Sequence, residues 1–75
     1  MLSEYAYEDL REAVKKNPTQ ENINALGAWF STYGSSYWNG ESFNADGFTV
    51  WPIYSEEEDD YGCFELLRYE LGGPQ

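Results

Sequence analysis

The sequence contains no histidine, a single cysteine and only four basic residues among 75. Without histidine it lacks the commonest general base and a usual zinc ligand. One cysteine can form neither an internal disulfide nor a Cys–His nucleophile pair. A chain of this length also leaves little room for a cleft that could hold a substrate. We therefore expect a protein that is not an enzyme and that uses neither a metal ion nor a cofactor.

Positive charge is the scarcest feature, because fourteen acidic residues against four basic ones give a net charge of −10. Such a charge opposes direct contact with nucleic acid or an anionic membrane, and it favours a basic protein surface as partner. No apolar run approaches the roughly 18 residues of a membrane span, and residues 1–3 lead into charged sequence rather than a signal peptide. Together with the lone Cys63, these features predict a cytoplasmic protein.

Leucine, isoleucine, valine and phenylalanine supply only 14 of the 75 residues, which at this charge is typical of disordered chains. Three tryptophans and seven tyrosines compensate, because each large aromatic side chain can bury roughly 150–250 Å². The length allows one hydrophobic core and no second one. We therefore expect a single ordered domain over residues 1–75, with a core built mainly from rings.

A first helix is predicted over residues 4–16, which contain neither glycine nor proline. Ser3 is its expected N-cap, and acidic residues near its start and lysines at its end match the helix dipole. A second helix is predicted over residues 20–33, with Thr19 as N-cap and Gly34 in the left-handed position after its end. Gly27 lies inside this helix, and close approach of the first helix would explain it.

The remaining residues predict strands. Residues 48–54 alternate between two faces, and Pro52 requires an edge strand or a position that faces solvent. Strands are also expected at 41–44 and 63–71, with residues 55–60 as a loop. The apolar residues of 63–71 also fit the spacing of a helix. Tyr61-Gly62 and the β-rich segment before it suggest a hairpin, however, and therefore favour a strand. The sequence thus predicts an α+β fold, in which two N-terminal helices pack on a three-stranded antiparallel β-meander.

A run of five adjacent carboxylates is the most conspicuous candidate site. If extended, it rises about 3.3 Å per residue, close to the roughly 3.4 Å per phosphate of one DNA strand. Consecutive carboxylates cannot all converge on one ion, so the run predicts no metal site. The alternative is a solvated loop held open by repulsion between like charges. The run consists of Glu56, Glu57, Glu58, Asp59 and Asp60.

Two further groups are candidates for partner binding. Glu4, Glu8 and Glu12 are spaced to form an acidic ridge on the first helix, unless they are an ordinary solvent face with Glu12 paired to Lys16. Most aromatic residues are expected in the core. Tyr37 and Trp38 follow the second helix in a turn-rich segment, and they are the expected exposed contact anchors.

The stretch from residue 29 to 48, WFSTYGSSYWNGESFNADGF, resembles a pattern in short acidic proteins of bacterial mobile elements. It covers about a quarter of the chain and brings no catalytic motif. In size and charge the chain also resembles anti-CRISPR inhibitors and other phage-encoded DNA mimics. That resemblance implies an inhibitor whose carboxylates block the nucleic-acid channel of a nuclease. The alternative is an aromatic-faced interaction or regulatory module whose acidity serves solubility alone.

Overall fold

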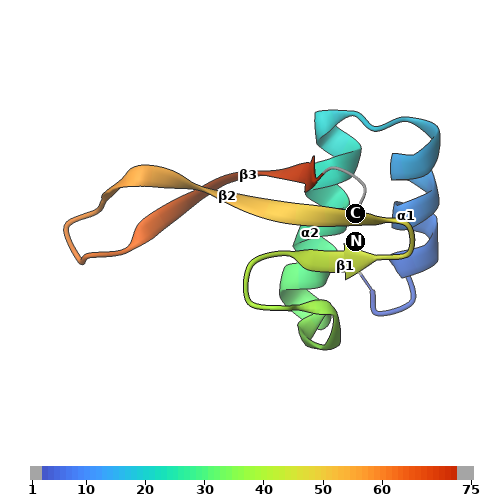
Figure 1. The fold of residues 1–75 in the computed structure, drawn as a ribbon, viewed down its shortest axis with the longest axis horizontal. Helices are drawn as coiled ribbons and strands as arrows, with labels where there is room; N and C mark the ends of the chain where they lie inside the picture. Colours follow the sequence, from blue (N-terminus) through green and yellow to red (C-terminus); the bar gives the residue numbers. More distant parts are fainter. Residues whose placement is uncertain (1–2, 73–75) are drawn as a thin grey trace.

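The computed structural model describes residues 3–72 and shows two helices followed by a three-stranded antiparallel sheet (Figure 1). The sheet order is β1-β2-β3, so the α+β class and the meander predicted from the sequence are confirmed. No helix in these 70 residues is both long and apolar enough to cross a membrane. The elements are α1 (Tyr7–Lys16), α2 (Gln20–Tyr33), the 3₁₀ helix η1 (Ser35–Tyr37), β1 (Phe43–Ala45), β2 (Phe48–Glu58) and β3 (Phe64–Gly72).

Helix α1 begins three residues later than predicted, and Ser3 is not its cap. Ala6 occupies the N-cap position and makes no side-chain capping bond. The backbone carbonyl of Ser3 instead accepts hydrogen bonds from Ala6 N, at 3.1 Å, and from the indole Nε1 of Trp29, at 2.9 Å. A buried indole N–H needs an acceptor, and supplying one ties the segment before α1 to α2. Glu4 therefore lies in a turn outside the helix.

Helix α2 has the predicted N-cap, because Thr19 Oγ1 accepts a hydrogen bond from Asn22 N at 3.2 Å. The prediction for its other end was wrong, since Gly34 has φ −97° rather than a left-handed conformation. Gly34 is needed for space: an added Cβ would lie 2.7 Å from Phe30 Cα. The N–H of Gly34 closes the helix by donating to the Phe30 carbonyl at 2.8 Å.

The buried side chains form one cluster between the helices and the sheet, and rings make up half of it. Phe30 stacks on Phe43 at a centroid separation of 5.1 Å. The half-buried rings of Tyr7 and Tyr37 lie against this cluster, 5.2 Å apart, and burial raises the pKa of Tyr7 above its ordinary value of 10.0. The members are Val14, Ile23, Leu26, Trp29, Phe30, Phe43, Val50 and Tyr69.

Gly27 lies under the ring of Tyr69 in β3, so the prediction that α1 approaches it was wrong. A Cβ at position 27 would overlap three carbon atoms of that ring. The hydroxyl of Tyr69 is hydrogen-bonded to Ser31 Oγ, one turn further along α2. Tyr69 is only 5% exposed, and it is the residue through which β3 packs on the helix.

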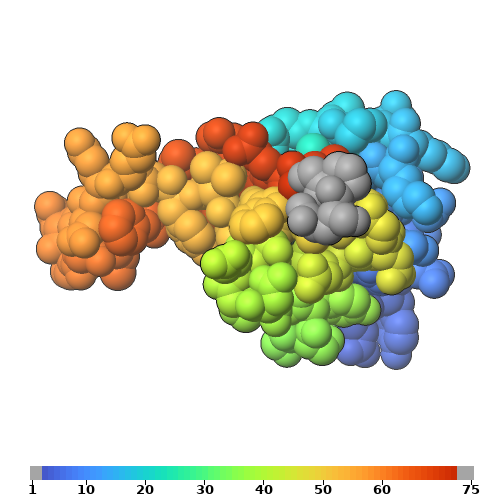
Figure 2. Space-filling view, viewed as in Figure 1, coloured from blue at the N-terminus to red at the C-terminus, as the bar shows by residue number. Residues whose placement is uncertain are grey.

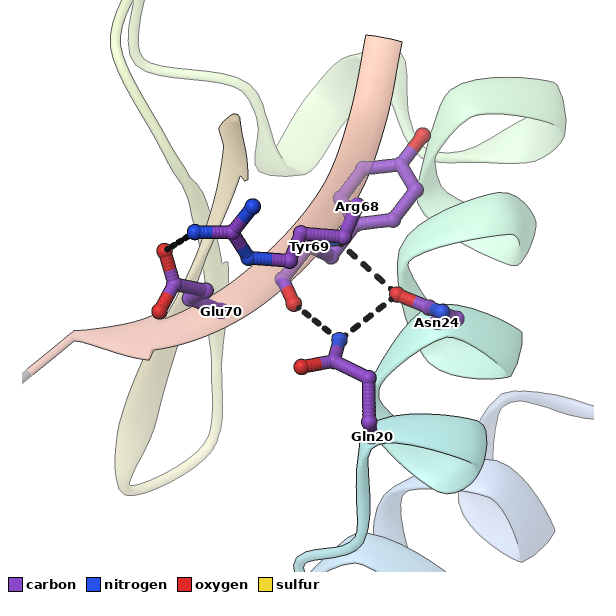
Figure 3. Close-up of polar contacts among 5 residues, drawn as sticks. All are labelled: Gln20, Asn24, Arg68, Tyr69 and Glu70. Carbon is purple, nitrogen blue, oxygen red and sulfur yellow. Dashed lines mark hydrogen bonds and ion pairs between the residues drawn. The ribbon is translucent and has the colours of Figure 1, made fainter. Parts of the chain in front are cut away.

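Strand β2 is central in the sheet, not an edge strand, yet it contains Pro52. Opposite Pro52, the backbone of Tyr69 is bonded to α2 side chains (Figure 3): its N–H donates to Asn24 Oδ1 at 3.0 Å, and its carbonyl accepts from Gln20 Nε2 at 2.6 Å. Since Tyr69 directs both backbone groups away from β2, Pro52 needs no N–H toward β3. On its other side, β1 pairs only with residues 48–50. Pro52 thus lies beyond the end of β1.

The strand bounds also differ from the prediction. The first strand occupies Phe43–Ala45 rather than 41–44, and the two-residue turn after it places Gly47 at φ 97°. Strand β2 continues through Glu58, so four of the six residues of the predicted loop 55–60 are strand. Pairing decides this, because Glu58 lies opposite Phe64 in β3. Strand rather than helix is confirmed for the last element.

Candidate protein-binding site: an acidic hairpin arm and the groove at its base

The far half of the β2–β3 hairpin extends beyond the helices as an arm (Figure 1). We define the arm as residues 54–67. In the space-filling view it stands clear of the body of the molecule (Figure 2). The arm accounts for the elongated shape of the molecule, whose principal extents are 38 × 27 × 22 Å.

Asp59 organises the tip of the arm. Its Oδ1 accepts hydrogen bonds from Tyr61 N at 2.8 Å and from Cys63 N at 2.9 Å, and its own N–H donates to the Cys63 carbonyl. Gly62 completes the turn with φ 79°. The N–H groups of Cys63 and Tyr61 hold the pKa of the Asp59 carboxyl below its ordinary value of 3.8. Asp59 therefore contributes to the shape of the tip as well as to its charge.

Ser55 stabilises an irregularity in the arm. Three residues separate Tyr54 from Glu58 on β2, but only Glu65 separates their partners Leu66 and Phe64 on β3. The Ser55 hydroxyl bridges this mismatch, because Oγ accepts from Glu65 N at 3.0 Å and donates to the Glu57 carbonyl at 2.9 Å. A hydroxyl thus replaces a lost ladder bond where the acidic residues begin.

The arm carries six exposed carboxylates and no basic residue. All four basic residues lie elsewhere, in α1 and at Arg68. Arg68 pairs with Glu70 at 3.2 Å, and Arg11 pairs with Asp46 at 3.3 Å. Within residues 3–72, no ion pair involves an arm carboxylate, so the negative charge of the arm is left uncompensated. The six are Glu56, Glu57, Glu58, Asp59, Asp60 and Glu65.

Exposed apolar side chains lie on the same arm. Each is more than 40% exposed, and Tyr61 at the tip reaches 90%. A two-stranded hairpin with no core behind it is marginally stable on its own, and clustered exposed apolar residues mark interaction surfaces. The arm therefore combines uncompensated charge with exposed apolar side chains. These residues are Tyr54, Tyr61, Phe64, Leu66 and Leu67.

A groove of about 330 Å³ lies where the arm leaves the body. The end of α2 and the start of η1 contribute three hydroxyl side chains to it, and the sheet and the segment before β1 contribute rings and a proline. None of the lining residues is charged. They are Ser31, Thr32, Ser35, Trp38, Phe43, Pro52 and Tyr54.

The predicted aromatic anchors differ in exposure. Trp38 is 44% exposed, with its ring 4.9 Å from that of Phe43, and it lines the groove. Tyr37 is half-buried, because its ring packs against those of Tyr7 and Phe30. Trp38 is therefore available for contact, and Tyr37 mainly serves the core.

Neither of the predicted acidic groups forms the continuous row of carboxylates expected from the sequence. Glu8 and Glu12 are exposed on α1, but Glu4 precedes the helix and the three do not form one helical ridge. Glu12 contacts Lys15 and Arg11, each at 3.7 Å, rather than Lys16. The five-residue run is not one extended row either, because strand ends at Glu58 and the turn begins. Among residues 3–72 no group of three potential ligands could hold a metal ion.

The sequence interpretation missed the groove and the apolar residues of the arm. Apolar residues on both sides of the acidic run, such as Tyr54 and Phe64, were a usable signal, because the strands extend through them. Nothing local to Ser31 or Pro52 indicated that they line the same groove. Comparisons with protein-family models, curated proteins and solved structures found no match for this chain.

Proposed function

We propose that this protein is an inhibitor that places its acidic arm in the basic groove of a nucleic-acid-binding protein. A nuclease, blocked in the manner of anti-CRISPR DNA mimics, is the expected target. One observation carries the proposal: the projecting hairpin holds six carboxylates that make no ion pair within residues 3–72. A groove that receives phosphates presents the complementary charge.

The shape of the arm modifies the mimicry expected from the sequence. Glu56 and Glu57 lie in the irregular stretch between Tyr54 and Glu58, Glu65 lies on the opposite strand, and the turn at Asp59 adds charge at the tip. The arm therefore presents carboxylates from both strands and from its tip. That distribution suits insertion between two basic walls better than alignment along a single row of phosphate sites.

Charge and apolar contact have separate roles in this proposal. Uncompensated carboxylates accelerate encounter with a basic groove, and this steering weakens as ionic strength rises. The exposed rings and leucines of the arm then hold the complex, since apolar contact governs dissociation more than encounter.

The test is capture from a bacterial extract on the immobilised protein at low ionic strength, with elution by duplex DNA and identification by mass spectrometry. We expect nucleic-acid-binding proteins to be captured and to be released by DNA. The arm variant Glu56→Gln/Glu57→Gln/Glu58→Gln should weaken capture. Exposed pairs contribute roughly 0.2–1 kcal/mol each, so the triple substitution should cost about 0.6–3 kcal/mol of binding free energy.

The matched control is Asp9→Asn/Glu21→Gln/Glu41→Gln, which changes net charge equally at exposed positions outside the arm. It should leave capture intact. Equal loss in both variants would show that only overall charge matters. Capture that persists in the arm variant, or that DNA does not release, would contradict the proposal.

The second candidate function is an interaction module that binds through apolar contact alone. The exposed arm residues Tyr61 and Phe64 favour it. Binding of this kind should change little with salt, and it should be lost in Tyr61→Ser/Phe64→Ser while surviving the glutamine substitutions.

A further inference from the structure

We infer that the groove at the base of the arm receives an arginine side chain of the partner protein. The inference rests on the proposed function in taking the partner to be a basic protein. The groove would then be a specific recognition site beside the negatively charged arm. The groove's volume, about 330 Å³, is at the lower end of the roughly 300–1,000 Å³ of small-molecule sites, which suits one side chain.

The aromatic side chains of the groove supply flat surfaces for a planar cation. Trp38 and Tyr54 line it, and they remain 44% and 53% exposed. A guanidinium group stacks favourably on such rings, and tryptophan is the strongest partner. Phe43 and Pro52 provide apolar contact for the methylene stem.

The hydroxyl side chains of the groove have hydrogen-bonding constraints that favour a donor. Thr32 Oγ1 already donates its proton to the Ala28 carbonyl at 3.0 Å, so only its lone pairs are available. Ser31 Oγ shares a hydrogen bond with the Tyr69 hydroxyl. A ligand rich in N–H groups satisfies such acceptors, and guanidinium carries five donors and no acceptor.

The end of helix α2 adds negative potential at the same place. Ser31 and Thr32 belong to its last turn, which contains no basic residue. The N–H of Gly34 closes the helix at the Phe30 carbonyl, and the following carbonyls lie beyond the intrahelical ladder. A cation is favoured at a helix C-terminus, and the nearby acidic arm reinforces this preference.

Other occupants fit less well. An anion would face the helix C-terminus and the acidic arm, both of which repel it. A purely apolar side chain would leave the acceptors of Thr32 and the last turn without donors. Lysine would bring a compact ammonium that neither stacks flat nor reaches several acceptors at once. Arginine meets all three requirements of the lining.

The experiment is an NMR titration of the isotope-labelled full chain with Nα-acetyl-arginine amide. Nα-acetyl-citrulline amide is the control ligand, because it keeps the length and planarity of arginine without the charge. We expect the arginine probe to shift the Trp38 indole N–H and the Ser35 amide saturably, with the citrulline probe at least fivefold weaker. Trp38→Leu should weaken arginine binding about two- to fivefold, the loss typical of an exposed cation–π contact. Tyr61→Leu, at the tip of the arm, is the matched control and should leave it unchanged.

Two results would overturn the inference: equal shifts from both probes, or arginine shifts confined to the amides of residues 56–60. The second result would leave the proposed function standing, since the arm would still attract cations. Conversely, arginine bound in the groove together with undiminished capture by the Glu56→Gln/Glu57→Gln/Glu58→Gln variant would refute the proposed function and keep the groove assignment.

Discussion

The contact between Gly27 and Tyr69 predicts a substitution whose effect changes sign with its background. Gly27 lies inside α2, where alanine is favoured over glycine by about 1 kcal/mol of helix propensity. Helix propensity alone thus predicts that Gly27→Ala stabilises the protein. In the folded structure, the new Cβ would overlap the Tyr69 ring, and that ring is buried against the helix.

The magnitudes decide the sign. Overpacking a buried contact costs about 1–3 kcal/mol, and overlap with three ring atoms points to the upper end. Gly27→Ala should therefore destabilise the protein by about 2 kcal/mol after its helix gain is subtracted. Tyr69→Ala should cost about 3–5 kcal/mol, as expected for loss of a buried aromatic side chain. In that second background the overlap is gone, so Gly27→Ala should stabilise by about 1 kcal/mol.

The assay is urea unfolding of the four proteins of this double-mutant cycle, followed by circular dichroism. The expected coupling between the two positions is about 3 kcal/mol, at the upper end of the range for residues in contact. A 75-residue chain has about 4–11 kcal/mol of total stability, so Tyr69→Ala should be studied with added osmolyte. Tyr61→Ala, which removes an exposed tyrosine, is the control and should change stability by less than about 0.5 kcal/mol. A stabilising effect of Gly27→Ala in the native background would refute the close packing of Tyr69 on Gly27.

Two further predictions concern the contact of β3 with α2 and the tip of the arm. Asn24→Ala should lower the free energy of unfolding, measured in urea, by about 1–3 kcal/mol, because it leaves the part-buried N–H of Tyr69 without its acceptor. Asn24→Asp keeps that acceptor, so equal losses in both variants would contradict this explanation. At the tip, the folded-state pKa of Asp59 is depressed below 3.8, so its stabilisation of the turn is complete above that pH and is lost as pH falls through the lower folded value. The amide shifts of Tyr61 and Cys63 should therefore titrate with a midpoint below 3.8, and a midpoint at or above that value would disprove the hydrogen bonds.

Local features of the fold could be read from the sequence because neighbouring residues encode them. Thr19 caps α2 as expected, and Gly47 lies in the turn between the strands expected at 41–44 and 48–54. At Ser3 the local prediction was wrong, because a distant contact decides the structure there. The carbonyl of Ser3 accepts a hydrogen bond from the indole N–H of Trp29. This interaction, rather than a side-chain cap, fixes the segment before α1.

The order of amino acids alone sets the charge of this protein and the segment in which that charge is concentrated. The sequence contains no lysine or arginine between Lys16 and Arg68. Whatever the fold, the acidic run therefore has no basic residue next to it in the sequence. The sequence also determined the order of helices and strands, because hydrophobic period and turn residues act over a few positions.

That Tyr69 covers Gly27, and that the hairpin projects with a groove at its base, follows instead from contacts between distant segments of the chain. These features join residues more than twenty positions apart, such as Ser31 and Tyr54. Local periodicity contains no information about such pairs. Their proximity follows from how the sheet packs on α2, where the backbone of Tyr69 finds its partners in Asn24 and Gln20.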